Sequence, residues 1–148
     1  MSHVATIEII IKDLEALKQA CKECGLEFVQ GQKTYKWYGK WVQDYHGNDA
    51  AYKHGIDPKN YGKCDHAIRV PNNPQAYEIG VVKVDKGYTL VWDFWNGGFG
   101  LEKLAGPNCS NVVQNYSKNV TLKKLRNMGY SVKHKTNTEG DIEIEATR

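Results

Sequence analysis

The sequence predicts an α+β fold, a two-layer sandwich with a mostly antiparallel sheet and two helices on one face, in a ferredoxin-like topology. Three observations lead to this prediction. Segments with strand character outnumber helical ones, helical periodicity occurs in only two segments, and short turn motifs join successive strands into hairpins. The length of 148 residues suits one domain, so residues 1–148 are expected to form a single unit.

The chain opens with a predicted strand, helix and second strand. Residues Val4–Ile11 are rich in β-branched side chains, which favour a strand. Asp13 is a suitable N-cap for the helix, and Gly25 is a suitable residue to end it. Between them, apolar side chains recur at spacings of three and four, at Leu14, Leu17, Cys21 and Cys24. Extended structure is expected to resume over Leu26–Val29.

Residues 31–65 form an insertion in which neither the strand period nor the helix period persists. Seven aromatic residues lie between Tyr35 and Tyr61. A short strand is expected over Thr34–Val42. The remainder is expected to be a long, irregular but ordered loop.

The middle of the chain predicts three strands. His66–Val70 forms the first, and Pro71 ends it. Tyr77–Val84 and Tyr88–Trp95 form a hairpin, whose three-residue turn Asp85-Lys86-Gly87 would place the glycine in the left-handed conformation. Both faces of Tyr88–Trp95 are largely apolar, so a central position in the sheet is expected.

A loop over Asn96–Asn108 leads into the second helix. Ser110 is expected to cap this helix, which runs to about Met128. Two strands follow, over Tyr130–Thr136 and Asp141–Ala146. In the last strand isoleucines alternate with acidic residues, which predicts one face in water.

Several stretches resemble one known family when they are taken together. They are Met1-Ser2-His3 before the first strand, Tyr77-Glu78-Ile79-Gly80, the run Gly87–Trp95, and the second helix closing on Gly129-Tyr130. They resemble the uncharacterised family of hypothetical chloroplast open reading frame 35, which has relatives in algal plastids, cyanobacteria and bacteriophages. The resemblance implies a small α+β protein of unknown activity and transfers no catalytic residues. It leaves much of Gly31–Asp65 uncovered.

The composition is that of a globular protein, with 41% apolar, 25% charged and 11% aromatic residues. Wholesale disorder, a collagen-like chain and a coiled coil are therefore excluded. The formal net charge is +3, from 20 lysines and arginines against 17 acidic residues. This balance argues against a dedicated nucleic-acid or membrane-surface protein. No apolar run approaches the length of a membrane span, so no membrane partner is expected.

The N-terminus shows no secretory signal, which predicts a cytoplasmic protein with reduced cysteines. Cys21 and Cys24 have the spacing of half a zinc site. Both lie on the apolar stripe of the predicted helix, however, and Cys64 and Cys109 stand alone in the sequence. Core packing is the favoured interpretation, with zinc as the alternative, and no metal or cofactor is expected.

An acid–base site could be assembled from Asp65, His66 and Asp93, with His46 and His54 from the insertion. Nothing in the spacing enforces such an arrangement. The sequence contains no nucleophile elbow, phosphate-binding loop or metalloprotease motif. A small hydrolase or metal-dependent enzyme therefore stays a secondary hypothesis.

The most suggestive pattern is an aromatic and basic cluster in the insertion. Aromatic rings can stack on bases while neighbouring lysines contact phosphates. The cluster consists of Tyr35, Trp37, Tyr38, Trp41 and Tyr45, interleaved with Lys33, Lys36 and Lys40. The alternative is that these aromatic side chains cover an open face of the sheet.

The glycine-rich stretch Asn96–Gly100 lies before the second helix, where backbone N–H groups can bind an anion. Residues 31–65 carry six lysines and four aspartates, which suits a small phosphate-bearing molecule and is thin for duplex nucleic acid. The two features together predict a ligand site. Its candidate residues are Tyr35, Lys36, Trp37, Tyr38, Lys40, Trp41, Gly97, Gly98 and Phe99.

The resulting hypothesis is a non-enzymatic module that binds a small phosphorylated or nucleotide-like ligand. Because the resemblance includes bacteriophage relatives, an accessory protein that sequesters such a ligand is the narrower form. The alternative is a protein-interaction or homo-oligomerisation module in which the aromatic cluster forms a buried contact.

Overall fold

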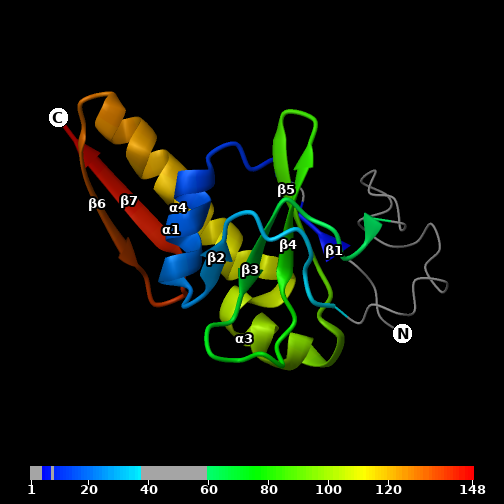
Figure 1. Ribbon diagram of the computed structural model, residues 1–148. Helices are drawn as coiled ribbons and strands as arrows, with labels where there is room; N and C mark the ends of the chain where they lie inside the picture. Colours follow the sequence, from blue (N-terminus) through cyan, green and yellow to red (C-terminus); the bar gives the residue numbers. More distant parts are fainter. Residues whose placement is uncertain (1–4, 8, 38–59) are drawn as a thin grey trace.

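The computed structural model describes residues 5–7, 9–37 and 60–148. The main sheet is antiparallel throughout and has the strand order β1-β5-β4-β3-β2 (Figure 1). Its strands are β1 (Ala5–Thr6), β2 (Glu27–Val29), β3 (His66–Arg69), β4 (Ile79–Val84) and β5 (Gly87–Trp92). Since β5 has a neighbour on each side, its expected interior position is confirmed.

In the part of the chain that the structure describes, three α-helices accompany the sheet: α1 (Leu14–Glu23), the short α3 (Leu101–Ala105) and α4 (Ser110–Asn127). The two longer helices lie where the sequence predicts them. Asp13 caps α1 as expected, because its Oδ1 accepts a hydrogen bond of 3.1 Å from the backbone N–H of Ala16. The phenol oxygen of Tyr116 on α4 accepts hydrogen bonds from the backbone N–H groups of Lys12 and Asp13, which ties the start of α1 to α4.

The helices cover one face of the main sheet with a continuous apolar core. Leu17 and Cys21 of α1, Leu101 of α3 and Val112 of α4 are all fully buried in this core. The sheet contributes Ile68, Ile79, Val81, Leu90 and Trp92.

The opposite face of the sheet is covered by the described ends of the insertion. Tyr35, Tyr61 and Cys64 pack there on Ala67 and Val91, and Trp37 is partly buried beside them. Thr34 forms an isolated bridge with Lys63, which brings the two ends of the insertion together. Residues 38–42 of the strand expected over Thr34–Val42 lie outside the described residues.

The C-terminal strands β6 (Ser131–Thr136) and β7 (Ile142–Thr147) form a separate two-stranded sheet. Helix α4 extends past α1, and the hairpin runs back along it, with its turn beside Gln114 in the first half of the helix (Figure 1). The α+β class with a mostly antiparallel sheet and two main helices is thus confirmed. The ferredoxin-like sandwich is not, because the strands after the last helix do not join the main sheet.

Four local expectations are corrected. The hairpin between β4 and β5 pairs Val84 with Gly87, so its turn has two residues, and Lys86 rather than Gly87 is left-handed, with φ 72°. Trp95 lies beyond the end of β5. The loop over 96–108 contains α3. Ser110 is the first residue of α4, and the residue at the N-cap position is Cys109, with φ 56°.

Candidate ligand-binding site

A turn over Trp95–Gly100 has an unusual backbone. Asn96, Gly97, Gly98 and Phe99 all have positive φ, between 52° and 64°, so four successive residues wind left-handed. Glycine adopts this conformation freely and asparagine tolerates it, but a side chain such as that of Phe99 costs about 1–2 kcal/mol. Strained residues persist where their surroundings hold them, and they concentrate at functional sites. We call residues 95–100 the left-handed turn.

Hydrogen bonds from three directions hold the left-handed turn in place. Oδ1 of the buried Asp93 accepts 2.9 Å from the backbone N–H of Trp95. The N–H of Tyr77 donates 2.8 Å to the carbonyl of Gly98. Nδ2 of Asn73 donates 3.3 Å to the carbonyl of Phe99. The strained conformation is therefore fixed by Asp93, directly after β5, and by the segment that precedes β4.

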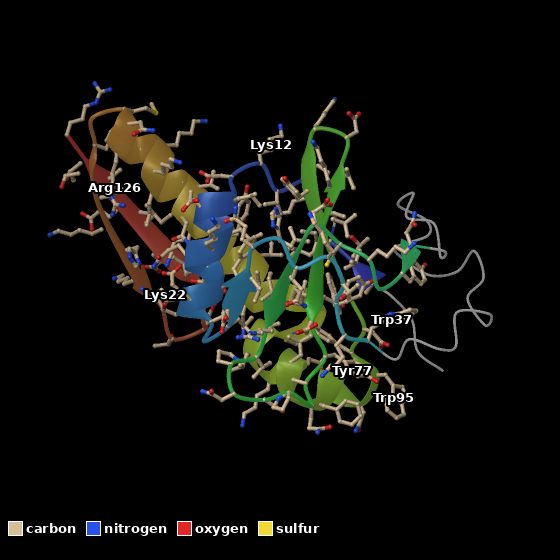
Figure 2. All side chains as sticks on the ribbon, in the orientation of Figure 1. Lys12, Lys22, Trp37, Tyr77, Trp95 and Arg126 are labelled. Atoms are coloured by element: carbon tan, nitrogen blue, oxygen red, sulfur yellow. The ribbon has the colours of Figure 1, made fainter. Side chains whose placement is uncertain are left out.

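The left-handed turn displays two aromatic rings. Trp95 is 41% exposed and Phe99 is 39% exposed, and their ring centroids lie 5.8 Å apart. Tyr77 is buried and meets the Phe99 ring edge-on at 5.1 Å. Tyr77 and Trp95 lie close together at one end of the molecule in Figure 2. We call the exposed pair Trp95 and Phe99 the aromatic platform.

A groove of about 340 Å³ lies next to the aromatic platform. Asn73 connects the two, because it lines the groove and donates its side-chain hydrogen bond to Phe99. The other lining residues are Lys36, Arg69, Val70, Asn72, Pro74, Ala76 and Glu78. The groove therefore offers two cations, two amides and the carboxylate of Glu78 beside an aromatic surface. We call it the Lys36 groove.

Glu78 fixes the position of Lys36 within this groove. Its Oε1 accepts 2.9 Å from the backbone N–H of Lys36 and 3.0 Å from Nε2 of Gln32. Its own N–H donates 2.8 Å to the carbonyl of Lys36. Nζ of Lys36 donates to the carbonyl of Pro74. The segment of the insertion that contains Lys36 is thereby held beside the segment that supports the left-handed turn.

The candidate residues from the sequence fall into three groups. Gly97, Gly98 and Phe99 belong to the left-handed turn, and Lys36 lines the adjacent groove. Tyr35 is only 3% exposed and Trp37 stacks edge-on against Tyr61 at 5.7 Å. Tyr38, Lys40 and Trp41 lie outside the described residues. Of the aromatic cluster, Tyr35 thus covers the sheet and offers no stacking surface, as the alternative interpretation expected.

Sequence reasoning missed Trp95, Asn73 and Arg69. The alternation of apolar residues continues through Trp95 and therefore predicts a strand there. The sequence Asn96-Gly97-Gly98 directly after it is a turn signal that could have moved the strand end. Asn73 and Arg69 carry no such local signal, because their position depends on the packing of the segment before β4.

Two residues of the hypothetical acid–base site use their side chains as hydrogen-bond acceptors for backbone N–H groups. Oδ2 of Asp65 accepts 2.7 Å from the N–H of Lys83, and Nδ1 of His66 accepts 2.9 Å from the N–H of Gly31. The register aligns His66 with Val81 and Leu90, so Asp93 lies about 10 Å farther along the strand direction. Burial lowers the pKa of His66. His46 and His54 lie outside the described residues.

All four cysteines are free thiols with raised pKa values. Burial raises the pKa of Cys21 and of Cys64 to about 12, and that of Cys109 well above its usual range. Cys24 is the more accessible member of its pair, and Nδ2 of Asn115 donates to its sulfur at 3.6 Å. Within residues 5–7, 9–37 and 60–148, no group of three or more metal-ligating side chains is placed to hold a metal.

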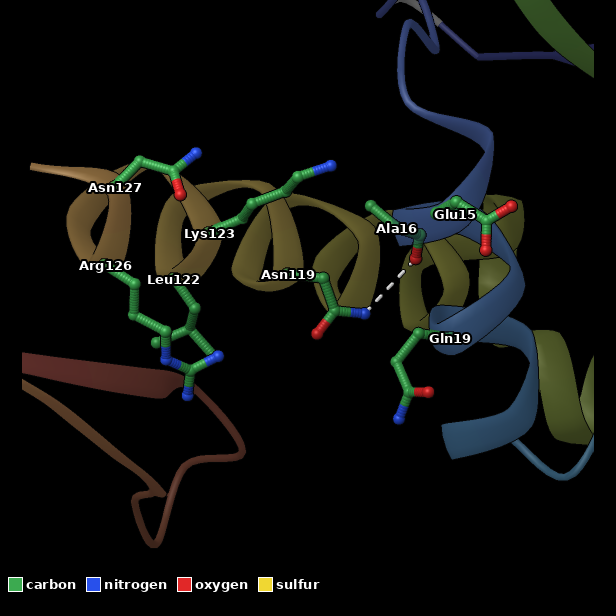
Figure 3. A pocket seen from close by; sticks show the side chains of 8 residues that line it. All are labelled: Glu15, Ala16, Gln19, Asn119, Leu122, Lys123, Arg126 and Asn127. Carbon is green, nitrogen blue, oxygen red and sulfur yellow. Dashed lines mark hydrogen bonds between the residues drawn. The ribbon is translucent and has the colours of Figure 1, made fainter.

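A second groove, of about 400 Å³, lies between α1 and the far half of α4 (Figure 3). Asn119 forms its floor and donates 3.3 Å to the carbonyl of Ala16. Lys123 is bound to Asp13 at 2.9 Å. Arg126 lies in the last turn of α4, where a cation complements the helix dipole without any ligand. This groove therefore points less strongly to a ligand than the Lys36 groove does.

No helix in the described part of the chain combines the length and the apolar character that a bilayer crossing needs. A search of curated proteins and a search of solved structures each found no significant match. A family model described as a protein of unknown function, DUF1257, matches residues 49–144. The match spans more than half of the chain and includes the left-handed turn. The chain therefore belongs to the DUF1257 family, a family of proteins of unknown function.

Proposed function

We propose that this protein is a non-enzymatic module that binds a small phosphorylated or nucleotide-like ligand. The observation that carries the proposal is the aromatic platform, which a strained backbone turn holds beside the Lys36 groove. An aromatic ring that stays exposed forgoes the free energy of burial, and the strained backbone of the turn adds a further cost to the stability of the fold. A ligand that stacks on the rings would offset both costs.

The chemistry of the two neighbouring surfaces suggests the class of ligand. The rings of Trp95 and Phe99 suit a flat heterocycle, because every base has a π-face and stacking tolerates different bases. Lys36 and Arg69 would meet a phosphate group in the groove. Arg69 also pairs with Glu27 at 2.9 Å, so Lys36 is the cation that we place nearest to the phosphate.

The narrower form of the proposal follows the resemblance noted in the sequence. The family match is consistent with the resemblance to an uncharacterised family. We propose that the matched family and that of hypothetical chloroplast open reading frame 35 are the same. A cytoplasmic accessory protein that sequesters a nucleotide, in a bacteriophage for example, would need tight binding and no catalytic group. The platform and the groove offer binding contacts of this kind.

Titration calorimetry of the full chain with AMP, adenosine, ribose 5-phosphate and inorganic phosphate tests the proposal. AMP should bind, and the three fragments should each bind more weakly, because each lacks one of the two contacts. Phe99→Ala and Trp95→Ala should weaken AMP binding by about 10–100-fold, the range expected for a lost stacking contact. Lys36→Ala should weaken AMP binding and leave the affinity for adenosine unchanged.

The matched controls change exposed residues elsewhere. Lys22→Ala removes an exposed cation of α1, and Met128→Ala removes a side chain that is 52% exposed after α4. Neither should change AMP affinity. Absence of AMP binding to the folded wild type, or binding that survives Phe99→Ala and Trp95→Ala, would contradict the proposal.

A further inference from the structure

The hairpin of β6 and β7 is an isolated two-stranded sheet. Its register continues over six residue pairs, from Ser131–Thr147 to Thr136–Ile142, without a bulge. One face packs on α4 through the partly buried Val132, Ile142 and Ile144, and Nε2 of Gln114 on α4 donates 3.1 Å to the carbonyl of Gly140 in the turn. Two strands alone are marginally stable in water, and here the packing on α4 supplies the support that a third strand would otherwise give.

Among the described residues, no other strand pairs with the backbone groups at either edge of the hairpin. The N–H of Asn137 donates 2.8 Å to the carbonyl of Asp141, which fixes the pairs that exchange hydrogen bonds inside the hairpin. Antiparallel pairs alternate, so Lys133–Glu145 and Lys135–Glu143 are bonded pairs. The even-numbered residues from 132 to 136 and from 142 to 146 therefore point their N–H and C=O groups outward.

The main sheet and the hairpin differ in how their edges are protected. The edge strands of the main sheet are only two and three residues long, at β1 and β2. Short edges of this kind limit unwanted pairing. The hairpin has two edges of six residues with no proline, and in the part of the chain that the structure describes no other strand pairs with them. These edges are open to a strand from another molecule.

The charged side chains on each edge strand determine which strand of another molecule can pair with it favourably. On the solvent face, β6 carries Lys133 and Lys135, and β7 carries Glu143 and Glu145. Nζ of Lys135 lies 3.5 Å from Oε2 of Glu143. Two β6 edges would place lysines opposite lysines, and two β7 edges would place glutamates opposite glutamates, which is unfavourable. Only β6 against β7 places opposite charges together.

We propose that β6 of one copy pairs antiparallel with β7 of a second copy, which extends the hairpin into a continuous sheet between molecules. The residue pairing found within one hairpin can be repeated between the two copies. His134 of one copy then forms a hydrogen-bonded pair with Ile144 of the other, and lysines of β6 again lie beside glutamates of β7. This contact is head-to-tail, so assembly grows with concentration into a ring or an open chain.

Sedimentation velocity of the full chain over a range of concentrations tests this proposal. The wild type should form larger species as concentration rises, and high salt should weaken them, because solvent-exposed charges are screened. K133E/K135E makes both edges acidic and E143K/E145K makes both edges basic. Each variant alone should be monomeric, with association weakened by about tenfold or more.

Mixing the two variants provides the decisive measurement. An acidic-edged copy and a basic-edged copy complement each other, so the mixture should associate where neither variant does alone. This outcome also shows that both variants are folded. K22E/K103E changes two exposed lysines of α1 and α3 by the same charge and should associate like the wild type. Circular dichroism first shows that each variant keeps the wild-type fold, because each places like charges opposite one another within its own hairpin. A wild type that stays monomeric, folded variants that associate like the wild type, or a mixture of folded variants that stays monomeric would each overturn the proposal.

Discussion

The ring of Tyr35 lies directly over the α-carbon of Gly80. A β-carbon added at Gly80 would clash with Cδ1 of Tyr35 and come within 2.9 Å of Cγ2 of Val91. The missing side chain of Gly80 is therefore what lets the insertion pack on the sheet. This contact joins the segment that carries Lys36 to the strand that follows Glu78, so it also positions the Lys36 groove.

Gly80→Ala should destabilise the protein by about 1–3 kcal/mol, because the added methyl group must displace a buried ring. Urea unfolding of both proteins measures the difference. The double variant Gly80→Ala/Tyr35→Ala should show coupling, since the clash disappears with the ring. Equal losses in the presence and absence of Tyr35 would show that the clash is not the cause.

His66 should make stability depend on pH. Its Nδ1 accepts from the N–H of Gly31, and the rings of Phe28 and Tyr88 lie 5.4 and 5.7 Å from its ring. Burial lowers the pKa of His66 below its ordinary 6.5, although Asp65 opposes the change. The unfolded chain then binds more protons just below pH 6.5, so the free energy of unfolding falls as pH is lowered through that range.

Urea unfolding from pH 7.5 to pH 5 checks this dependence. His66→Gln keeps a hydrogen-bond acceptor without a titrating ring, so its stability should vary less over the same range. The control His134→Gln changes an exposed histidine of β6 and should follow the wild type. Identical pH profiles for all three proteins would contradict the prediction.

Lys86→Gly should stabilise the protein. Lys86 is exposed in the turn between β4 and β5 and has φ 72°, a conformation that costs a lysine about 1–2 kcal/mol. Glycine removes that cost, but it loses more conformational freedom on folding, which costs about 0.5–1 kcal/mol. The free energy of unfolding should therefore rise by up to about 1 kcal/mol. The control Lys83→Gly, at an exposed strand position, should destabilise. Thermal unfolding distinguishes the two directions.

The cysteines should differ in reactivity in the order of their burial. With all four thiol pKa values raised, reaction with a disulfide reagent at pH 8 should be slow. Cys24 should react first, because it is the one cysteine that is not buried. Mass spectrometry after brief labelling identifies the site, and labelling in denaturant should modify all four at similar rates. First labelling at Cys109 would contradict this order.

Elements whose signals are local could be predicted from the sequence. The period of three and four and the cap at Asp13 locate α1, and the hairpin of β6 and β7 follows from its alternation and its turn. Which sheet that hairpin joins depends instead on the length of α4. Its eighteen residues carry the chain about 27 Å from the point where the helix starts, past the main sheet.

The turn after β4 shows a second limit. A glycine at position 87 suggests a left-handed residue, but a β-carbon there would lie 2.5 Å from the carbonyl oxygen of Ile11. Gly87 is needed because the backbone of Ile11, far away in the sequence, approaches closely through its isolated bridge with Tyr88, and no local pattern reveals that. In the candidate site, the glycine-rich sequence around Gly97 and Phe99 indicates a loop that could bind a ligand. No sequence pattern around Asn73 indicates that the fold brings it beside Phe99.

The left-handed turn also reverses the usual order of substitution tolerance. At positions 96 and 97, glycine, asparagine and aspartate should be accepted, while the β-branched residues that suit the neighbouring strand should be excluded. Gly98 is buried, and a β-carbon there would lie 3.0 Å from the side chain of Leu101, so position 98 favours glycine alone. At position 99, backbone strain favours a small residue, whereas the display of a ring favours Phe99. Stability and recognition thus select different side chains at one position. Under selection for folding alone this position would be free to lose its aromatic ring, and under selection for binding it would not.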